Sequence, residues 1–158
     1  MTTKYTSVTG GCFCRVVRYE ADVSLHDAYY CHCKTCQKTS GAPAEVGVLV
    51  KPGTLKFTGN EPKYFQSSPF GRRGFCFECG SRLIWMSPGN DEWTNVSAGS
   101  LDHPEHVVPK EHTCVESQLP WYQLADDLPR KRSDEEPDLI AAWTDAGMSS
   151  DGVILELD

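Results

Sequence analysis

Eight cysteines in 158 residues, most of them in short clusters, constrain this chain more than any other feature. The clusters are Cys12-Phe13-Cys14, Cys31-His32-Cys33-Lys34-Thr35-Cys36 and Cys76-Phe77-Glu78-Cys79, and Cys114 stands apart. CxC and CxxC spacings are typical of metal ligands, because neighbouring sulfurs can converge on one ion. Residues 1–6 lack the apolar core of a secretory signal, so we expect a cytoplasmic protein whose thiols stay reduced. Metal binding is therefore favoured over disulfides.

Counting ligands favours two metal sites of different kinds. A structural zinc takes four protein ligands, whereas a catalytic zinc takes three and leaves the fourth position to water or substrate. The first and last pairs together make a four-sulfur site, and the central three make an open one. We call these sets the outer cluster, which is Cys12, Cys14, Cys76 and Cys79, and the inner cluster, which is Cys31, Cys33 and Cys36.

Other ligand sets are open at this point. Cys31 and Cys33 could instead join Cys76 and Cys79, but that pairing strands more thiols. His32 could close the inner cluster, although in an extended chain its side chain points opposite to its neighbours. Cys114 is expected to be a buried core thiol, with a reactive or fourth-ligand role as the alternative. The other histidines, which are expected on the surface or in loops, are His26, His103, His106 and His112.

Short β-rich segments separated by turn signals predict a mainly β fold. Val17 and Tyr19 are expected on one strand face, and residues 82–86 and 93–97 to pair as strands. The Gly/Pro/Ser run after the inner cluster is typical of a loop. Further strands are expected near residues 25–30, 45–50, 54–58, 64–66, 106–108 and 113–115.

The chain is expected to form one zinc-binding domain over residues 1–132 and an appendage over 133–158. Pro137 and Gly147 bracket an apolar pattern of helical spacing, which predicts a short helix. Residues 152–157 could add a strand. The net charge of -7 argues against nucleic-acid binding, and no stretch is apolar enough for a membrane span.

The ordered motifs resemble the glutathione-dependent formaldehyde-activating (GFA) family. The similarity covers about residues 9 to 132. The matching runs are Gly11-Cys12-Phe13-Cys14, Cys31-His32-Cys33-Lys34-Thr35-Cys36 with Ser40-Gly41-Ala42-Pro43, Arg73-Gly74-Phe75-Cys76-Phe77-Glu78-Cys79-Gly80-Ser81, Ala98-Gly99-Ser100-Leu101-Asp102, and Pro120-Trp121-Tyr122 with Leu128-Pro129.

The resemblance implies an Mss4-like fold with two Zn²⁺ per chain, a structural one on the outer cluster and a catalytic one on the inner cluster. It also implies a carbon-sulfur lyase that joins glutathione and formaldehyde into S-hydroxymethylglutathione, or cleaves the adduct. We expect a zinc-bound thiolate to be the nucleophile, because zinc deprotonates a thiol near neutral pH. A non-catalytic, zinc-stabilised protein-binding module is the alternative, since fold alone does not choose.

Glutathione carries two carboxylates, so cations near the motifs are candidates to hold it. Lys34 and Arg73 are the preferred ones, and Gln37 could add a hydrogen bond, although it could equally cap the turn after the cluster. Further candidates are Lys38, Ser40, Arg72 and Arg82.

Overall fold

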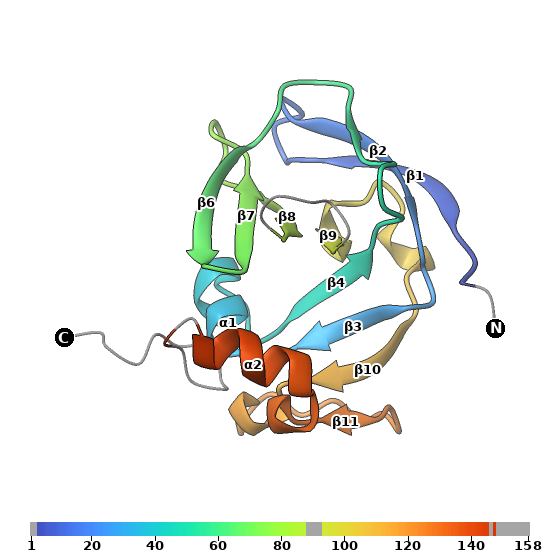
Figure 1. The fold of residues 1–158 in the computed structure, drawn as a ribbon. Coiled ribbons are helices and arrows are strands. Elements are labelled where there is room, and N and C mark those ends of the chain that lie inside the picture. Colours follow the sequence, from blue (N-terminus) through green and yellow to red (C-terminus); the bar gives the residue numbers. More distant parts are fainter. Residues whose placement is uncertain (1–2, 88–92, 146, 148–158) are drawn as a thin grey trace. The chain divides into compact units, whose positions relative to one another are not determined.

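A computed structural model describes residues 3–87, 93–145 and 147 and is mainly β (Figure 1). Its strands are β1 (Thr6–Gly11), β2 (Arg18–Val23), β3 (Ala28–Cys31), β4 (Glu45–Leu49), β5 (Lys56–Phe57), β6 (Lys63–Ser68), β7 (Gly71–Phe75), β8 (Arg82–Met86), β9 (Thr94–Ser97), β10 (Pro109–Thr113) and β11 (Arg130–Lys131). Its helices are α1 (Lys34–Ser40), α2 (Pro137–Asp145) and the 3₁₀ turns η1 (Ala98–Ser100), η2 (Pro104–His106), η3 (Val115–Ser117) and η4 (Ser133–Glu135).

The chain divides into two compact units, and each is built from two stretches of sequence. The first unit contains Met1–Ala28 and Val46–Pro109. The second contains Tyr29–Glu45 and Lys110–Asp158. The outer cluster belongs to the first unit, and the inner cluster and Cys114 belong to the second.

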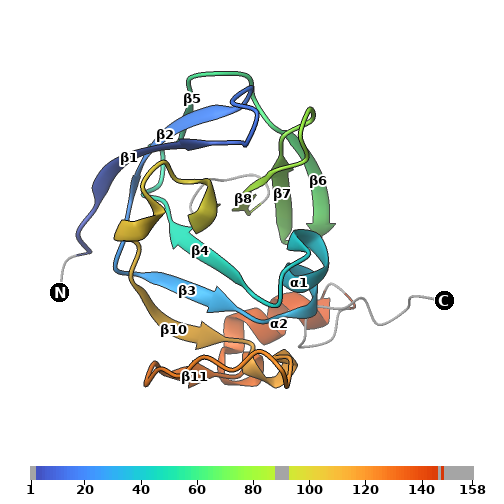
Figure 2. The same cartoon turned by 180° about the vertical axis from the view of Figure 1, so that it is seen from behind.

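The first unit is antiparallel β-structure around an apolar core. β1, β2 and β5 form one sheet (Figure 2), and a second run follows the order β4, β9, β8, β7, β6 (Figure 1). Val17 and Tyr19 are almost fully buried, as their alternation in sequence predicts. The predicted pairing of residues 82–86 with 93–97 is confirmed, because Ile84 lies opposite Val96 in the β8–β9 ladder. These strands hold both halves of the outer cluster on one framework.

In the second unit, β10 pairs in parallel with β11, and His112 lies opposite Arg130. The predicted loop after the inner cluster is wrong for Gln37–Ser40, which belong to the helix α1 (Lys34–Ser40). Cys33 is its N-cap, since the Cys33 Sγ accepts from the Cys36 amide at 3.3 Å. Gly41, at φ 71°, ends the helix in the left-handed conformation that glycine adopts without strain. The Gly/Pro/Ser run therefore marks the end of a helix.

The predicted C-terminal helix is confirmed as α2, where Trp143 is buried. Upstream of it, the backbone amide of Ser133 donates to the Glu116 carboxylate at 3.2 Å, and the Ser133 hydroxyl donates to the same carboxylate. The boundary at residue 133 stays a prediction. The predicted strand at 152–157 lies outside the described residues.

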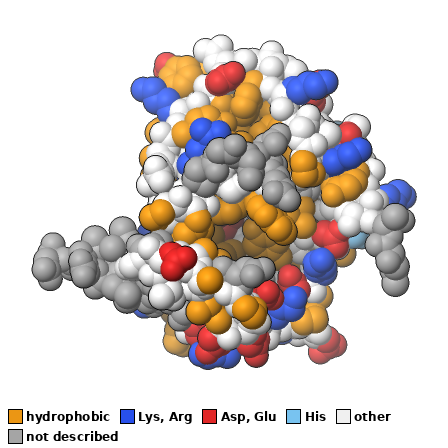
Figure 3. All heavy atoms as spheres, in the orientation of Figure 1, with side chains coloured by type: hydrophobic (Ala, Val, Ile, Leu, Met, Phe, Trp, Pro, Cys, Tyr) orange, Lys and Arg blue, Asp and Glu red, His pale blue; other side chains and the backbone are white. Residues whose placement is uncertain are grey.

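No helix in the described part of the chain is long and apolar enough to cross a membrane. Basic and acidic side chains are interspersed on the face drawn in Figure 3.

Candidate metal centres

The outer cluster gathers four sulfurs from two turns that are far apart in sequence. Cys12 and Cys14 follow β1, and Cys76 and Cys79 lie between β7 and β8. The four Sγ atoms all lie within 4.8 Å of one another. The turn at Cys76 closes through a 2.9 Å hydrogen bond from the Gly80 amide to the Cys76 carbonyl, with Gly80 at φ 75°. The fold thus delivers the four-sulfur arrangement that the spacing predicts.

The geometry of the outer cluster fits zinc. Zn–S bonds of about 2.3 Å in a tetrahedron place neighbouring sulfurs about 3.8 Å apart. The Sγ atoms of Cys12 and Cys14 are 3.5 Å apart, and those of Cys14 and Cys76 are 3.7 Å apart. No large rearrangement is needed for the four sulfurs to hold one ion.

The pKa values of the outer thiols diverge because the four groups compete for negative charge. The Ser81 hydroxyl lowers the pKa of Cys79 to about 5. The Val16 amide acts to lower the pKa of Cys14, but desolvation and the neighbouring sulfurs raise it to about 12. One thiolate therefore makes the next harder to form, and a bound cation would allow all four to ionise together.

The inner cluster lies where β3 meets α1. Cys31 ends the strand, Cys33 caps the helix, and Cys36 is one turn into it. The three Sγ atoms lie within 4.8 Å of one another. Cys33 and Cys36 are buried, whereas Cys31 is half-buried. A strand end followed by a tight helix turn is what brings a CxCxxC run onto one point.

Cys114 is buried, as predicted, but it also contacts the inner cluster. Its thiol shares hydrogen bonds with the thiols of Cys31 and Cys33. The bond with Cys114 raises the pKa of Cys33, and the bond with Cys31 raises the pKa of Cys114. The sequence leaves a fourth-ligand role for Cys114 as an alternative only, because Cys114 has no partner at metal-ligand spacing.

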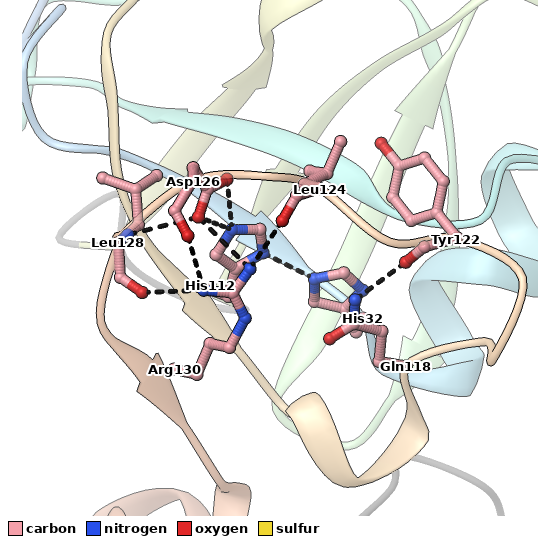
Figure 4. Close-up of polar contacts among 8 residues, drawn as sticks. All are labelled: His32, His112, Gln118, Tyr122, Leu124, Asp126, Leu128 and Arg130. Carbon is pink, nitrogen blue, oxygen red and sulfur yellow. Dashed lines mark hydrogen bonds and ion pairs between the residues drawn. The ribbon is translucent and has the colours of Figure 1, made fainter.

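His32 is not part of the inner group of ligand atoms, and its ring instead faces that of His112 (Figure 4). Its Nε2 lies 2.8 Å from Nδ1 of His112, and Nε2 of His112 lies 3.0 Å from the Asp126 carboxylate. An ionised Asp126 requires the proton of His112 on Nε2, so Nδ1 of His112 accepts from His32. The expectation that His112 is a surface or loop residue is wrong, since it is fully buried. His26, His103 and His106 are not buried.

The backbone of His32 is fixed at the same time. Its amide donates to the Thr113 carbonyl at 3.0 Å, and its carbonyl accepts from Nε2 of Gln37 at 2.7 Å. Burial, followed by the neighbouring His112, lowers the pKa of His32 to about 4. The imidazole is therefore neutral near pH 7. Because His32 separates Cys31 from Cys33, this network orients two members of the inner cluster.

The candidate glutathione contacts have different environments. Lys34 is exposed at the start of α1. Gln37 uses both amide hydrogens on backbone carbonyls, those of His32 and Ser117. Arg73 belongs to the first unit, is 5% exposed and donates from Nε to the Ser67 hydroxyl at 3.0 Å. Of these three, Lys34 alone offers a solvent-facing charge in the same unit as the inner cluster, and the further candidate Lys38 is also exposed on α1.

Comparison with known proteins agrees with the motifs. The sequence profile of the family described as glutathione-dependent formaldehyde-activating enzyme matches residues 7–117. An uncharacterised lyase of Schizosaccharomyces pombe is 23% identical over 117 residues, which cover 74% of this chain and 85% of that protein. A crystal structure of a Rhodobacter sphaeroides protein has a TM-score of 0.52 at 22% identity, covering 64% of this chain and 97% of that one, and shares the fold.

Proposed function

Because the chain belongs to the glutathione-dependent formaldehyde-activating enzyme family, we propose that it is a zinc-dependent carbon-sulfur lyase. Its substrates are glutathione or a similar small thiol and a small aldehyde, and its product is an adduct of the S-hydroxymethylglutathione type. The observation that carries this proposal is the inner cluster, three sulfurs within 4.8 Å of one another beside a fixed strand end. The outer cluster is proposed to be the structural zinc site.

In this proposal Cys31, Cys33 and Cys36 would hold the ion, and a thiol substrate would bind beside them. Zinc, when bound, would stabilise the thiolate form of that thiol near neutral pH. The thiol sulfur attacks the aldehyde carbon, an S–C bond forms, the C=O double bond becomes single, and the oxygen takes up the proton that the thiol loses. Cleavage runs the same changes in reverse.

Lys34 is proposed to pair with a carboxylate of glutathione, because it is exposed and lies next to Cys33 in sequence. Gln37 and Arg73 stay proposed contacts with narrower roles. Gln37 can reach a ligand only through its amide oxygen, since both its hydrogens are donated to the backbone. Arg73 is buried, so its main observed role is the hydrogen bond to Ser67.

A second candidate function is a non-catalytic binding module in which both metals only stabilise loops. The contact of Cys114 with Cys31 and Cys33 favours it, because a fourth protein sulfur can close a site. The two functions differ in whether an added thiol gains access to the inner cluster.

Exchange spectroscopy by NMR on a mixture of glutathione and formaldehyde would test the proposal. Zinc-loaded protein should speed exchange between free glutathione and its adduct, and Cys33→Ser should lose at least about 10-fold of that acceleration through the missing ligand. Serine is a good helix N-cap, so α1 is preserved in this variant. Phe13→Ala, at a 92% exposed position in the first unit, is the matched control. Equal exchange rates with and without wild-type protein would refute the lyase proposal.

A further inference from the structure

Nδ1 of His32 is a buried ring nitrogen without a hydrogen-bond partner. The His32 side chain is fully buried, and its Nδ1 contacts no donor or acceptor among the residues that the structure describes. Its Nε2, in contrast, lies 2.8 Å from Nδ1 of His112 (Figure 4). Most buried polar atoms are paired, and the exceptions mark strain, bound water or a catalytic role. This nitrogen therefore requires an explanation.

The hydrogen-bond chain beyond His32 decides whether that nitrogen is a donor or an acceptor. Oδ2 of Asp126 lies 3.0 Å from Nε2 of His112, and Oδ1 of Asp126 lies 3.2 Å from Nη2 of Arg130. Desolvation acts to raise the pKa of Asp126, but hydrogen bonds from His112 and the Leu128 amide bring it below its usual value. The carboxylate is therefore ionised at neutral pH and only accepts. The hydrogens of both imidazoles then lie on Nε2, which leaves Nδ1 of His32 as an acceptor.

The place of His32 in the chain relates this acceptor to the inner cluster. His32 lies between Cys31 and Cys33, two of the three sulfurs that gather within 4.8 Å of one another. Its amide and carbonyl are held by Thr113 and Gln37 at 3.0 and 2.7 Å, so its backbone is fixed. A fixed acceptor in the segment that joins two metal-capable sulfurs suits a ligand that brings an O–H donor. The S–CH₂–OH group of a thiol–aldehyde adduct is such a ligand.

We propose that Nδ1 of His32 accepts a hydrogen bond from the hydroxyl group of the adduct, and that His112 and Asp126 are positioning residues that keep His32 in the acceptor tautomer. The tautomer concerns the protein alone, and the contact with the adduct rests on the proposed function. No proton is transferred to His32 in this role, because the hydrogen bond only orients the S–CH₂–OH group. The hydroxyl distinguishes the adduct from the free thiol, so the contact favours the adduct.

Nitrogen NMR on the full zinc-loaded chain with isotope-labelled histidine tests the tautomer. We expect His32 in wild type to carry its hydrogen on Nε2 and none on Nδ1. Asp126→Asn should reverse both rings, because its amide oxygen can keep the contact with Arg130 while its amide nitrogen donates to Nε2 of His112. Asp127→Asn removes the same charge at the exposed neighbouring position and is the matched control.

Two results of this experiment would overturn the proposal. A hydrogen on Nδ1 of His32 in wild type would rule out the acceptor. Rings that stay unchanged in Asp126→Asn, or that reverse equally in Asp127→Asn, would rule out the positioning role of Asp126. Circular dichroism checks that each variant is folded, and the wild-type spectrum tests the acceptor without any variant.

The same spectra, recorded with a mixture of glutathione and formaldehyde, test the contact with the adduct. We expect the Nδ1 signal of His32 in wild type to shift with the mixture and not with glutathione alone. Asp126→Asn should lose this shift and at least about 10-fold of the acceleration of adduct exchange, because its Nδ1 no longer accepts.

The remaining outcomes separate this contact from the proposed function. An Nδ1 signal of His32 that ignores the mixture, in a protein that accelerates exchange, would assign Nδ1 to a bound water and overturn the contact. If wild type does not accelerate exchange but has the expected tautomer, the proposed function and the contact are both refuted. The positioning role of His112 and Asp126 would then still be upheld.

Discussion

At the scale of single residues, polar side-chain contacts position the segments that carry the cysteines. The chain from His32 through His112 to Asp126 fixes the residue between Cys31 and Cys33. In the first unit, the Asp102 carboxylate accepts from Nη1 of Arg18 at 2.8 Å and from the Thr9 hydroxyl at 2.6 Å. That contact ties β1 and β2 to the turn after η1. Each of these contacts predicts a measurable effect on stability.

Replacing His112 should destabilise the protein strongly. His112→Ala leaves Nε2 of buried His32 without its acceptor, and an unsatisfied buried group costs about 1–3 kcal/mol. We therefore expect the free energy of unfolding in urea to fall by that amount. His106→Ala, at an exposed histidine, should change it by no more than about 0.5 kcal/mol. Equal losses of unfolding free energy in the two variants would contradict a stabilising role for the hydrogen bonds from His32 through His112 to Asp126.

Asp102 should contribute stability that depends on pH. Hydrogen bonds from Arg18, then from Thr9, lower the pKa of Asp102 to about 2. Since the folded pKa lies below the unfolded value, the contribution is complete above about pH 4 and is lost as the pH falls toward about 2. The side chains of Arg18 and Asp102 are 30% and 35% exposed, so solvent screens their ion pair. Asp102→Asn should therefore lower the free energy of unfolding by only about 1 kcal/mol at pH 7.

The measurement is the free energy of unfolding of wild type and Asp102→Asn between pH 7 and pH 3. The difference between them should narrow as the pH falls. Glu20→Gln is the control, because Glu20 and Lys56 form an exposed pair at 3.9 Å that should contribute little. A difference that is constant over this range would show that the ion pair does not stabilise the fold.

At the scale of elements, the helix α1 determines the shape of the inner cluster. Its N-cap is Cys33, and Cys36 follows one turn later. Ser40 and Thr39 hydroxyls donate back to helix carbonyls, those of Cys36 and Thr35, at 2.6 and 2.7 Å. Gly41 then ends the helix. A short helix with defined capping at both ends therefore occupies a segment that the sequence predicts to be a loop.

Gly41→Ala should weaken this element through backbone strain alone. A Cβ at Gly41 would meet no atom within 4 Å, so the cost is that of a left-handed residue with a side chain, about 1–2 kcal/mol. Gly99→Ala is a matched control, since its Cβ also has open space and its φ is not in the left-handed range. Thermal unfolding of the two variants would separate strain from any general effect of alanine. A loss in Gly99→Ala as large as in Gly41→Ala would contradict this explanation.

Much of the framework could be predicted from local sequence, and the exceptions have physical reasons. Because successive side chains of a strand alternate between its two faces, Val17 and Tyr19 could be placed on one face, and both are buried. Turn residues separate most of the strands. The helix α1 could not be predicted, because it is only about two turns long and its N-cap is a cysteine, which is not among the preferred N-cap residues. The burial of His112 and the contact of Cys114 depend on strand pairing, which no local pattern reports.

At the scale of the whole molecule, the cysteine clusters are distributed between the two units. The outer cluster joins turns after β1 and β7 within the first unit, and the inner cluster lies in the second. Metal bound only in the folded state adds its binding free energy to stability. We expect a strong chelator to lower the melting temperature measured by circular dichroism, and re-added zinc to restore it. No shift on chelation would mean that neither cluster holds a stabilising metal.

The most direct test of the account is the zinc content per chain of protein purified without chelator. Wild type is compared with the double variant Cys31→Ser/Cys33→Ser, which keeps an N-cap on α1 and leaves the outer cluster intact. With circular dichroism confirming that both proteins are folded, we predict two zinc ions per chain in wild type and one in the variant. Equal zinc content in the two proteins would contradict the claim that the inner cluster is a separate metal centre.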